Sequence, residues 1–132
     1  MTTDSARITA LYAALCALLI VVLAVRVILL RWSTKAGIGD GGDRRLARAI
    51  RIHGNAIEYV PIALILMLVA ELSGAGAMLL HACGIALVAG RISHALGFAR
   101  TAGVSIGRSL GVAATFAAIL VLAGVDLQVF LR

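Results

Sequence analysis

An uncharged apolar run over residues 8–25 constrains the fold of this chain more than any other feature. A helix needs about 18 to 20 such residues to cross the hydrocarbon core of a bilayer, and this run meets that length. Arg26 and a further apolar turn follow it, in place of a small-residue cleavage site and a polar mature sequence. We therefore interpret the run as a spanning helix rather than a signal peptide. Charged residues make up only 14% of the chain, which is rare in a soluble domain of this length.

Glycine-rich and polar stretches divide the chain into four such segments. We predict helices over residues 6–32, 44–72, 77–98 and 107–131, joined by a glycine-rich loop, a tight turn at residues 73–76 and a polar connection at residues 99–106. Asp43 is placed to cap the second helix. The predicted fold class is all-α, an integral membrane four-helix bundle that forms one domain over residues 1–132. Many small residues in the third and fourth helices favour close packing.

The net charge of +6 has an explanation that needs no nucleic acid. The basic residues gather around the first and third connections, as the positive-inside rule expects of cytoplasmic loops. Both basic loops are therefore predicted to face the cytoplasm, and the even number of spans places both termini on the opposite side. Cys16 and Cys83 lie inside apolar runs, with no ligand spacing around them. We expect two buried thiols and no metal site.

A charged stripe runs along the first half of the second helix. Steps of four, three, four and three residues place its members on one face, because an α-helix has 3.6 residues per turn. Charge that faces lipid is costly, so this face is expected to point toward the bundle interior or toward a subunit interface. The stripe consists of Arg44, Arg48, Arg51, Asn55 and Glu58.

The third helix offers a partner for this stripe in Arg91 and His94, which share a face. Glu58 lies 15 residues before Ser73, and Arg91 lies 15 residues after Gly76, so the two sit at similar depth. We predict an ion pair between Glu58 and Arg91, within or between chains. A purely structural role for that pair is an equal alternative, since buried pairs often do no more than fix helix packing.

Three further arginines leave two alternatives open. Arg51 has no acid nearby except Glu58, and an interior guanidinium without an acid suits an anionic ligand. Arg108 opens the fourth helix, where the helix dipole already favours anions, so a cation there indicates an anion site. The other interpretation of Arg108 is an arginine that extends to the membrane interface. Arg26 is likewise either such an interfacial arginine or part of a pocket wall.

The sequence RIHGNAIEYVP at residues 51–61 resembles the signature of the MAPEG superfamily, the membrane-associated proteins in eicosanoid and glutathione metabolism. In that signature an arginine is followed by an asparagine four residues later, a glutamate three later and then a proline. The segments GRISH at residues 90–94 and RS at residues 108–109 match the family as well. The resemblance covers nearly the whole chain. The chain is similar to the short bacterial members of the family, which implies that the protein lies in a bacterial inner membrane.

The resemblance implies a homotrimer whose active sites lie between subunits and open to the cytosol, with the first two helices of one chain facing the last two of the next. It implies glutathione as co-substrate and assigns the catalytic, thiolate-stabilising role to Arg108. The residues that it implies for glutathione binding are Arg26, Arg51, Asn55, Glu58, Arg91, His94 and Ser109.

Three departures from the eicosanoid synthases narrow the expected activity. Gly54 stands where those enzymes have arginine, and Phe98 and Val112 stand where they have tyrosines, which argues against prostaglandin or leukotriene synthesis. The expected function is a glutathione-dependent transferase or peroxidase acting on lipophilic small molecules that enter from the bilayer. Two alternatives stay open: a non-catalytic membrane scaffold of the same fold, and a small transporter that uses a buried Glu58.

Overall fold

The computed structural model of the chain describes residues 6–100 and 105–131. Within those ranges it forms four α-helices, α1 (Arg7–Thr34), α2 (Arg44–Leu72), α3 (Ala77–Arg100) and α4 (Ile106–Phe130). Each is long and apolar enough to cross a membrane, which confirms the predicted fold class. All helix ends lie within two residues of their predicted positions. The connection predicted at residues 99–106 falls partly on residues 101–104, which lie outside the described ranges.

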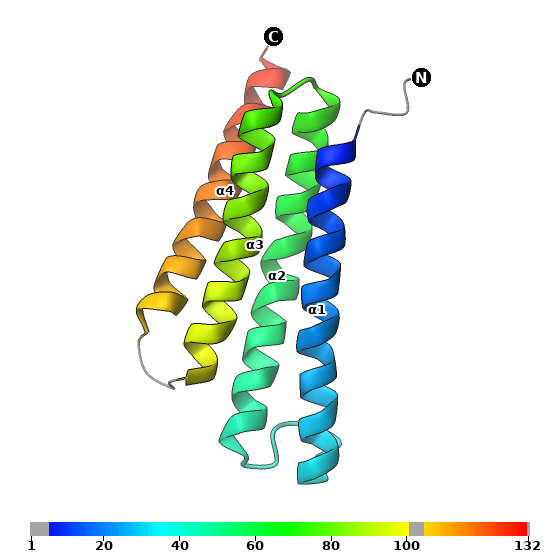
Figure 1. The fold of residues 1–132 in the computed structure, drawn as a ribbon, viewed down its shortest axis with the longest axis vertical. Coiled ribbons are helices and arrows are strands. Elements are labelled where there is room, and N and C mark those ends of the chain that lie inside the picture. Colours follow the sequence, from blue (N-terminus) through cyan, green and yellow to red (C-terminus); the bar gives the residue numbers. More distant parts are fainter. Residues whose placement is uncertain (1–5, 101–104, 132) are drawn as a thin grey trace.

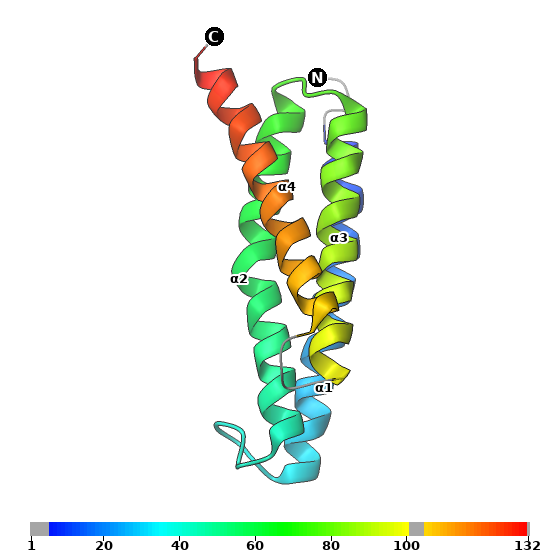
Figure 2. The ribbon, with the colours of Figure 1, turned by 90° about the vertical axis from the view of Figure 1, so that its left-hand side faces the viewer.

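The four helices run antiparallel to their neighbours along the chain, so α1 begins and α4 finishes at the same end of the bundle (Figure 1). We call this the turn end, because the turn at residues 73–76 also lies there. The loop end is the opposite one, where α1 and α3 finish and α2 and α4 begin. α2 and α3 are central, and α1 and α4 pack on opposite sides of them, with no close approach between the α1 and α4 backbones in the described residues. At the loop end the α1–α2 hairpin extends further than α3 and α4 do (Figure 2).

Local capping explains where the helices begin. The side chain of Asp43 accepts hydrogen bonds from the backbone N–H groups of Arg45 and Leu46 at 2.7 and 3.1 Å, which confirms the predicted cap of α2. Ser105 caps α4 in the same manner, since its hydroxyl accepts from the N–H of Arg108 at 3.2 Å. These two caps fix the first turns of the helices that begin at the loop end.

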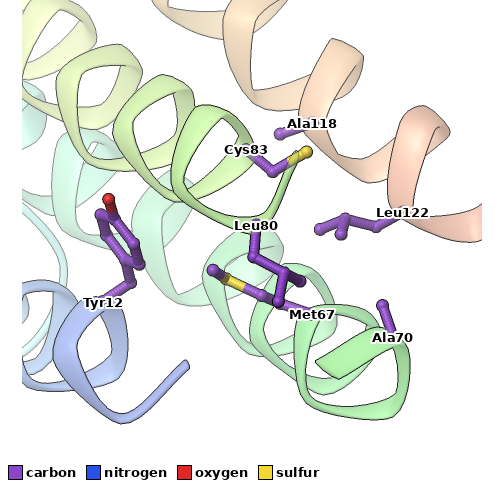
Figure 3. Close-up of a cluster of buried hydrophobic side chains, with 7 residues drawn as sticks. All are labelled: Tyr12, Met67, Ala70, Leu80, Cys83, Ala118 and Leu122. Atoms are coloured by element: carbon purple, nitrogen blue, oxygen red, sulfur yellow. The ribbon is translucent and has the colours of Figure 1, made fainter. Parts of the chain in front are cut away.

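The buried face of α2 forms the centre of the bundle. Its buried residues recur every three or four positions, as an inward-facing helical stripe requires: Leu46, Ala49, Ile52, Ala56, Val60, Ala63, Met67 and Ala70. Toward the turn end this stripe joins side chains of all four helices in one apolar cluster (Figure 3), made of Tyr12, Met67, Ala70, Leu80, Cys83, Ala118 and Leu122. Both cysteines are buried, as predicted, and Cys16 lies in a second cluster with Val60, Ala63 and Leu87.

Polar groups at the turn end bond to one another. The carboxylate of Glu71 accepts hydrogen bonds from the N–H groups of Ile8 and Thr9 at 2.8 and 2.7 Å. It thereby caps α1, which has no side-chain cap at its own N-terminus. The hydroxyl of Tyr12 lies 2.9 Å from Nδ1 of His81. His81, which has no charged neighbour in sequence, is therefore satisfied by a hydrogen bond from α1.

α3 and α4 approach most closely through glycines near the loop end. A Cβ atom on Gly111 would collide with the carbonyl oxygen of Gly90 and would lie 2.7 Å from the backbone nitrogen of His94. A Cβ on Gly97 would lie 2.6 Å from the backbone nitrogen of Arg108. Since real Cβ atoms do not approach so closely, only glycine allows this backbone contact. The contact holds His94 and Arg108 on adjoining helices at one level of the bundle.

Candidate functional site

A groove at the loop end brings together five residues that the sequence singled out. It has a volume of about 710 Å³ and opens between α2, α3 and α4. We call it the polar groove. Its apolar walls are Phe98, Val112, Ala113 and Phe116, and its polar lining consists of Arg51, Asn55, His94, Arg108 and Ser109.

Arg91 lies beneath the polar groove and is 2% exposed. Its Nη1 donates to Oδ1 of Asn55 at 2.5 Å, and its Nη2 donates to the carbonyl oxygen of Gly111 at 3.3 Å. A buried guanidinium is thus held by neutral acceptors alone among the described residues. Because Oδ1 of Asn55 is occupied by Arg91, the amide nitrogen of Asn55 is left to donate toward the groove.

The predicted ion pair between Glu58 and Arg91 is wrong within one chain. Ala56 and Val60 are buried, so the position between them faces the other way, and the side chain of Glu58 is exposed. Asn55, one helical turn earlier, takes the contact with Arg91 instead. An ion pair between chains stays a prediction.

The charged stripe of α2 faces outward from the single chain. Arg44, Arg51 and Glu58 are exposed, and Arg48 and Asn55 are partly buried. The first alternative, in which the stripe points into the bundle interior, is therefore wrong for Arg44, Arg51 and Glu58, whereas Asn55 does reach the buried Arg91. The second, a subunit interface, stays a prediction. The cause is the rotation of α2, whose alanine-rich face packs against α1 and α3 more closely than an arginine face could.

The two cations of the polar groove have no ionic partner in the described part of the chain. The guanidinium of Arg108 lies 5.0 Å from the ring centroid of Phe98, a cation–π arrangement that leaves its N–H donors available. Arg51 is exposed on the groove's α2 side. His94 is 5% exposed and packs against Phe98, with the ring centroids 5.9 Å apart. Two guanidiniums and the N-terminus of α4 together make the groove suited to an anion.

The structure does not bring Arg26 to this site within one chain. Arg26 lines a different groove, between α1 and α2, together with Arg45 and Arg48. Its implied contact with glutathione stays a prediction, and nothing in the geometry of a single chain supports it.

An apolar hollow that the sequence did not reveal adjoins the polar groove. It has a volume of about 310 Å³ and shares Phe116 with the groove. The ring of Tyr59 meets that of Phe116 at 5.1 Å, edge to face. A spacing of four residues from Arg108 through Val112 to Phe116 places all three on one face of α4, and this signal could have found the hollow. The remaining lining residues are Ile62, Ile119 and Leu120.

Comparison with known proteins identifies the family to which the chain is similar. The model of the MAPEG family matches residues 9–127, a range that includes every residue lining the polar groove. The chain is also similar to "Inner membrane protein YecN" of Escherichia coli strain K12, with 45% identity over 115 residues, or 87% of this chain and 86% of that protein. The protein of the same name from Escherichia coli O6:H1 shows the same identity and coverage.

Proposed function

Because this chain belongs to the MAPEG family, we propose that it is a membrane-bound, glutathione-dependent transferase or peroxidase that acts on lipophilic electrophiles. One observation supports this proposal above the others. The polar groove collects Arg51, Asn55 and Arg108 from two helices beside an apolar hollow, so an anionic thiol and an apolar molecule have adjoining places.

Glutathione suits the polar groove because it has two carboxylates. The guanidinium of Arg51 forms paired hydrogen bonds with a carboxylate, and the amide N–H of Asn55 donates to a second oxygen. Arg91 fixes the amide of Asn55 from below, through the hydrogen bond to Oδ1. His94 and Ser109 complete the polar lining. Glu58 lies one turn beyond Asn55 on the outer face of α2, where it attracts the amino group of the bound peptide.

Arg108 activates the sulfur. A thiol near pH 7 is mostly protonated, and a nearby guanidinium at a helix N-terminus stabilises the thiolate and lowers the thiol pKa. The thiolate then attacks an electrophilic carbon of a substrate in the apolar hollow. A sulfur–carbon bond forms, and the leaving group departs with its bonding pair. With a lipid hydroperoxide the thiolate attacks the outer oxygen instead: the O–O bond breaks, the lipid leaves as an alkoxide that takes a proton to become the alcohol, and the sulfur becomes a sulfenic acid. The thiol of a second glutathione then attacks this sulfur, which forms glutathione disulfide and releases water.

A homotrimer is part of this proposal. Arg51 and Glu58 face outward well inside α2, and charge exposed to lipid at that depth is costly. A neighbouring copy that covers this face removes the cost, and only such a copy could bring an Arg26 to the groove. We place the protein in a bacterial inner membrane with the loop end toward the cytoplasm, since the basic residues gather there and the relative is an inner membrane protein.

The transporter alternative requires Glu58 in a wet cavity. Glu58 is exposed on the outer face of α2 and lines neither groove at the loop end. The scaffold alternative predicts no ligand in the polar groove, so a binding measurement separates it from the enzyme.

The test is glutathione binding to the purified protein in detergent, measured by calorimetry, with thiolate absorbance at about 240 nm followed in parallel. We expect saturable binding with a thiolate signal. Arg51→Ala should weaken binding about 10- to 100-fold, because a charge-assisted hydrogen bond is lost. Arg108→Ala should keep binding and lose the thiolate signal.

The matched control is Arg44→Ala, which removes an exposed arginine of the same stripe that does not line the polar groove. It should leave both signals unchanged. Absence of binding to the folded wild-type protein would contradict the proposal and favour the scaffold.

A further inference from the structure

The last turn of α3 holds Arg108 at two points, its backbone and its side chain. A Cβ atom on Gly97 would lie 2.6 Å from the backbone nitrogen of Arg108, so the two helices touch there. At the next residue of α3, the guanidinium of Arg108 lies over the ring of Phe98, with 5.0 Å between the guanidinium carbon and the ring centroid. Two consecutive residues of α3 therefore set where Arg108 starts and where its charge lies.

The ring of Phe98 is itself packed against a buried side chain. His94 lies one turn earlier on α3 and is 5% exposed, and the centroids of the two rings are 5.9 Å apart. The backbone of His94 is in turn close to α4, since a Cβ on Gly111 would lie 2.7 Å from its nitrogen. The close packing of α3 against α4 thus fixes the ring on which the guanidinium of Arg108 lies.

An aromatic ring holds a cation without neutralising it. A carboxylate partner would cancel much of the charge of Arg108 and would use its N–H groups. A ring instead contacts the face of the planar guanidinium, so the N–H donors at its edge stay available for an anion. In agreement, the side chain of Arg108 has no hydrogen bond or ion pair with any residue in the described ranges. Its positive charge is therefore kept whole and confined to one place.

We propose that Phe98 is the positioning residue of Arg108: its ring holds the guanidinium beside the thiol of bound glutathione, and it thereby sets how readily that thiol ionises. This inference rests on the proposed function. An arginine side chain is long and flexible, so without the ring its charge would be spread over several rotamers. Because the attraction between two charges falls with their separation, the thiolate would be less stabilised although the arginine is still present.

The experiment is a pH titration of the thiolate absorbance of glutathione bound to the purified protein in detergent. Phe98→Leu removes the ring and keeps an apolar side chain. We expect the midpoint of the thiol titration to rise by about one pH unit, which is about tenfold less thiolate at a given pH below the midpoint. Phe98→Tyr keeps the ring and should titrate as the wild type does.

Calorimetry separates this role from a structural one. At a pH below both midpoints, Phe98→Leu should bind glutathione as tightly as the wild type, because the thiol is then protonated in both proteins and Arg51 and Asn55 still line the groove. A variant whose packing is damaged would instead lose affinity at every pH. Affinity lost below the midpoint, with the midpoint itself unchanged, would therefore overturn the inference.

Phe130→Leu is the control, because it removes a phenylalanine that is 85% exposed near the turn end and lines neither the polar groove nor the apolar hollow. It should titrate as the wild type does, and circular dichroism checks that all variants are folded. An unchanged midpoint in Phe98→Leu, or an equal rise in Phe98→Tyr, would overturn the inference and leave the proposed function standing. A folded wild-type protein that binds no glutathione would contradict the proposed function, and this inference with it.

Discussion

The two ends of the bundle use polar residues in opposite ways. At the turn end, polar groups bond to each other across helices: Glu71 caps α1, and the hydroxyl of Tyr12 meets His81. At the loop end, Arg26, Arg51 and Arg108 have no carboxylate partner among the described residues. The turn end therefore uses its polar groups to hold helices together, whereas the loop end keeps its donors available for ligands.

The two glutamates of α2 show the same contrast on one helix. Glu71 is partly buried and accepts two backbone N–H groups of α1. Glu58 is exposed on the outer face, with no hydrogen bond to any described residue. The difference teaches that an acid inside a membrane helix is not by itself a sign of function. What matters is whether the fold already supplies its partner.

The largest effect is expected where the backbones of α3 and α4 touch. Gly111→Ala places a Cβ against the carbonyl oxygen of Gly90 and the nitrogen of His94, so the helices must separate. We expect a loss of about 1–3 kcal/mol of stability, as overpacking typically causes, measured by thermal unfolding in detergent. Gly124→Ala is the control on the same helix, because a Cβ there meets nothing within 4 Å. Equal stability of the two variants would show that the glycine contact does not set the α3–α4 distance.

Replacing each of the two glutamates in turn tests the comparison most directly, because the two variants should lose different properties. Glu71→Ala removes the cap of α1 and should cost about 0.5–2 kcal/mol of stability while glutathione affinity is unchanged. Glu58→Ala should do the reverse, with affinity about tenfold lower and unfolding unaltered. Calorimetry and thermal unfolding of both variants measure the two quantities. If both variants lose stability alone, Glu58 has no part in ligand binding.

A smaller effect is expected from the tyrosine hydroxyls. Tyr12→Phe removes the hydrogen bond to His81 and should cost about 0.5–1.5 kcal/mol. Tyr59→Phe is its counterpart nearer the loop end, where the hydroxyl has no hydrogen bond to a described residue, and stability should not change. A larger loss for Tyr59→Phe, measured in the same unfolding assay, would reverse the comparison.

The smallest expected effect on stability comes from the Asp43 cap of α2 at the loop end. The side-chain hydrogen bond from Arg45, with the backbone N–H groups of Leu46 and Arg45, holds the pKa of Asp43 below its ordinary value. Its contribution to stability is therefore full above about pH 4, the unfolded pKa, and is lost as the pH falls through the lower folded pKa. Asp43→Asn keeps a capping oxygen but does not titrate. Below about pH 4, wild-type stability should decline relative to the variant, and parallel pH profiles of the two proteins would disprove this.

The sequence by itself determined the four spans, their ends and the cap at Asp43. These features follow from local properties, because a spanning helix needs only a sufficient apolar run, and helices begin and end at residues that cap or break them. The sequence also determined the family, since the spacing of Arg51, Asn55 and Glu58 is a property of one helix. Arg51, Asn55, His94, Arg108 and Ser109 were predicted as site residues, and all five line one groove.

The tertiary structure alone decided which polar groups meet. Equal depth allowed Arg91 to pair with Glu58, but the rotation of α2 turned Glu58 outward and gave the contact to Asn55. Arg26, on α1, lines a separate groove with Arg45 and Arg48 in place of the polar groove. The cap that Glu71 provides for α1 joins residues more than sixty positions apart. Helix rotation depends on how side chains of several helices pack together, and no spacing within one helix specifies it.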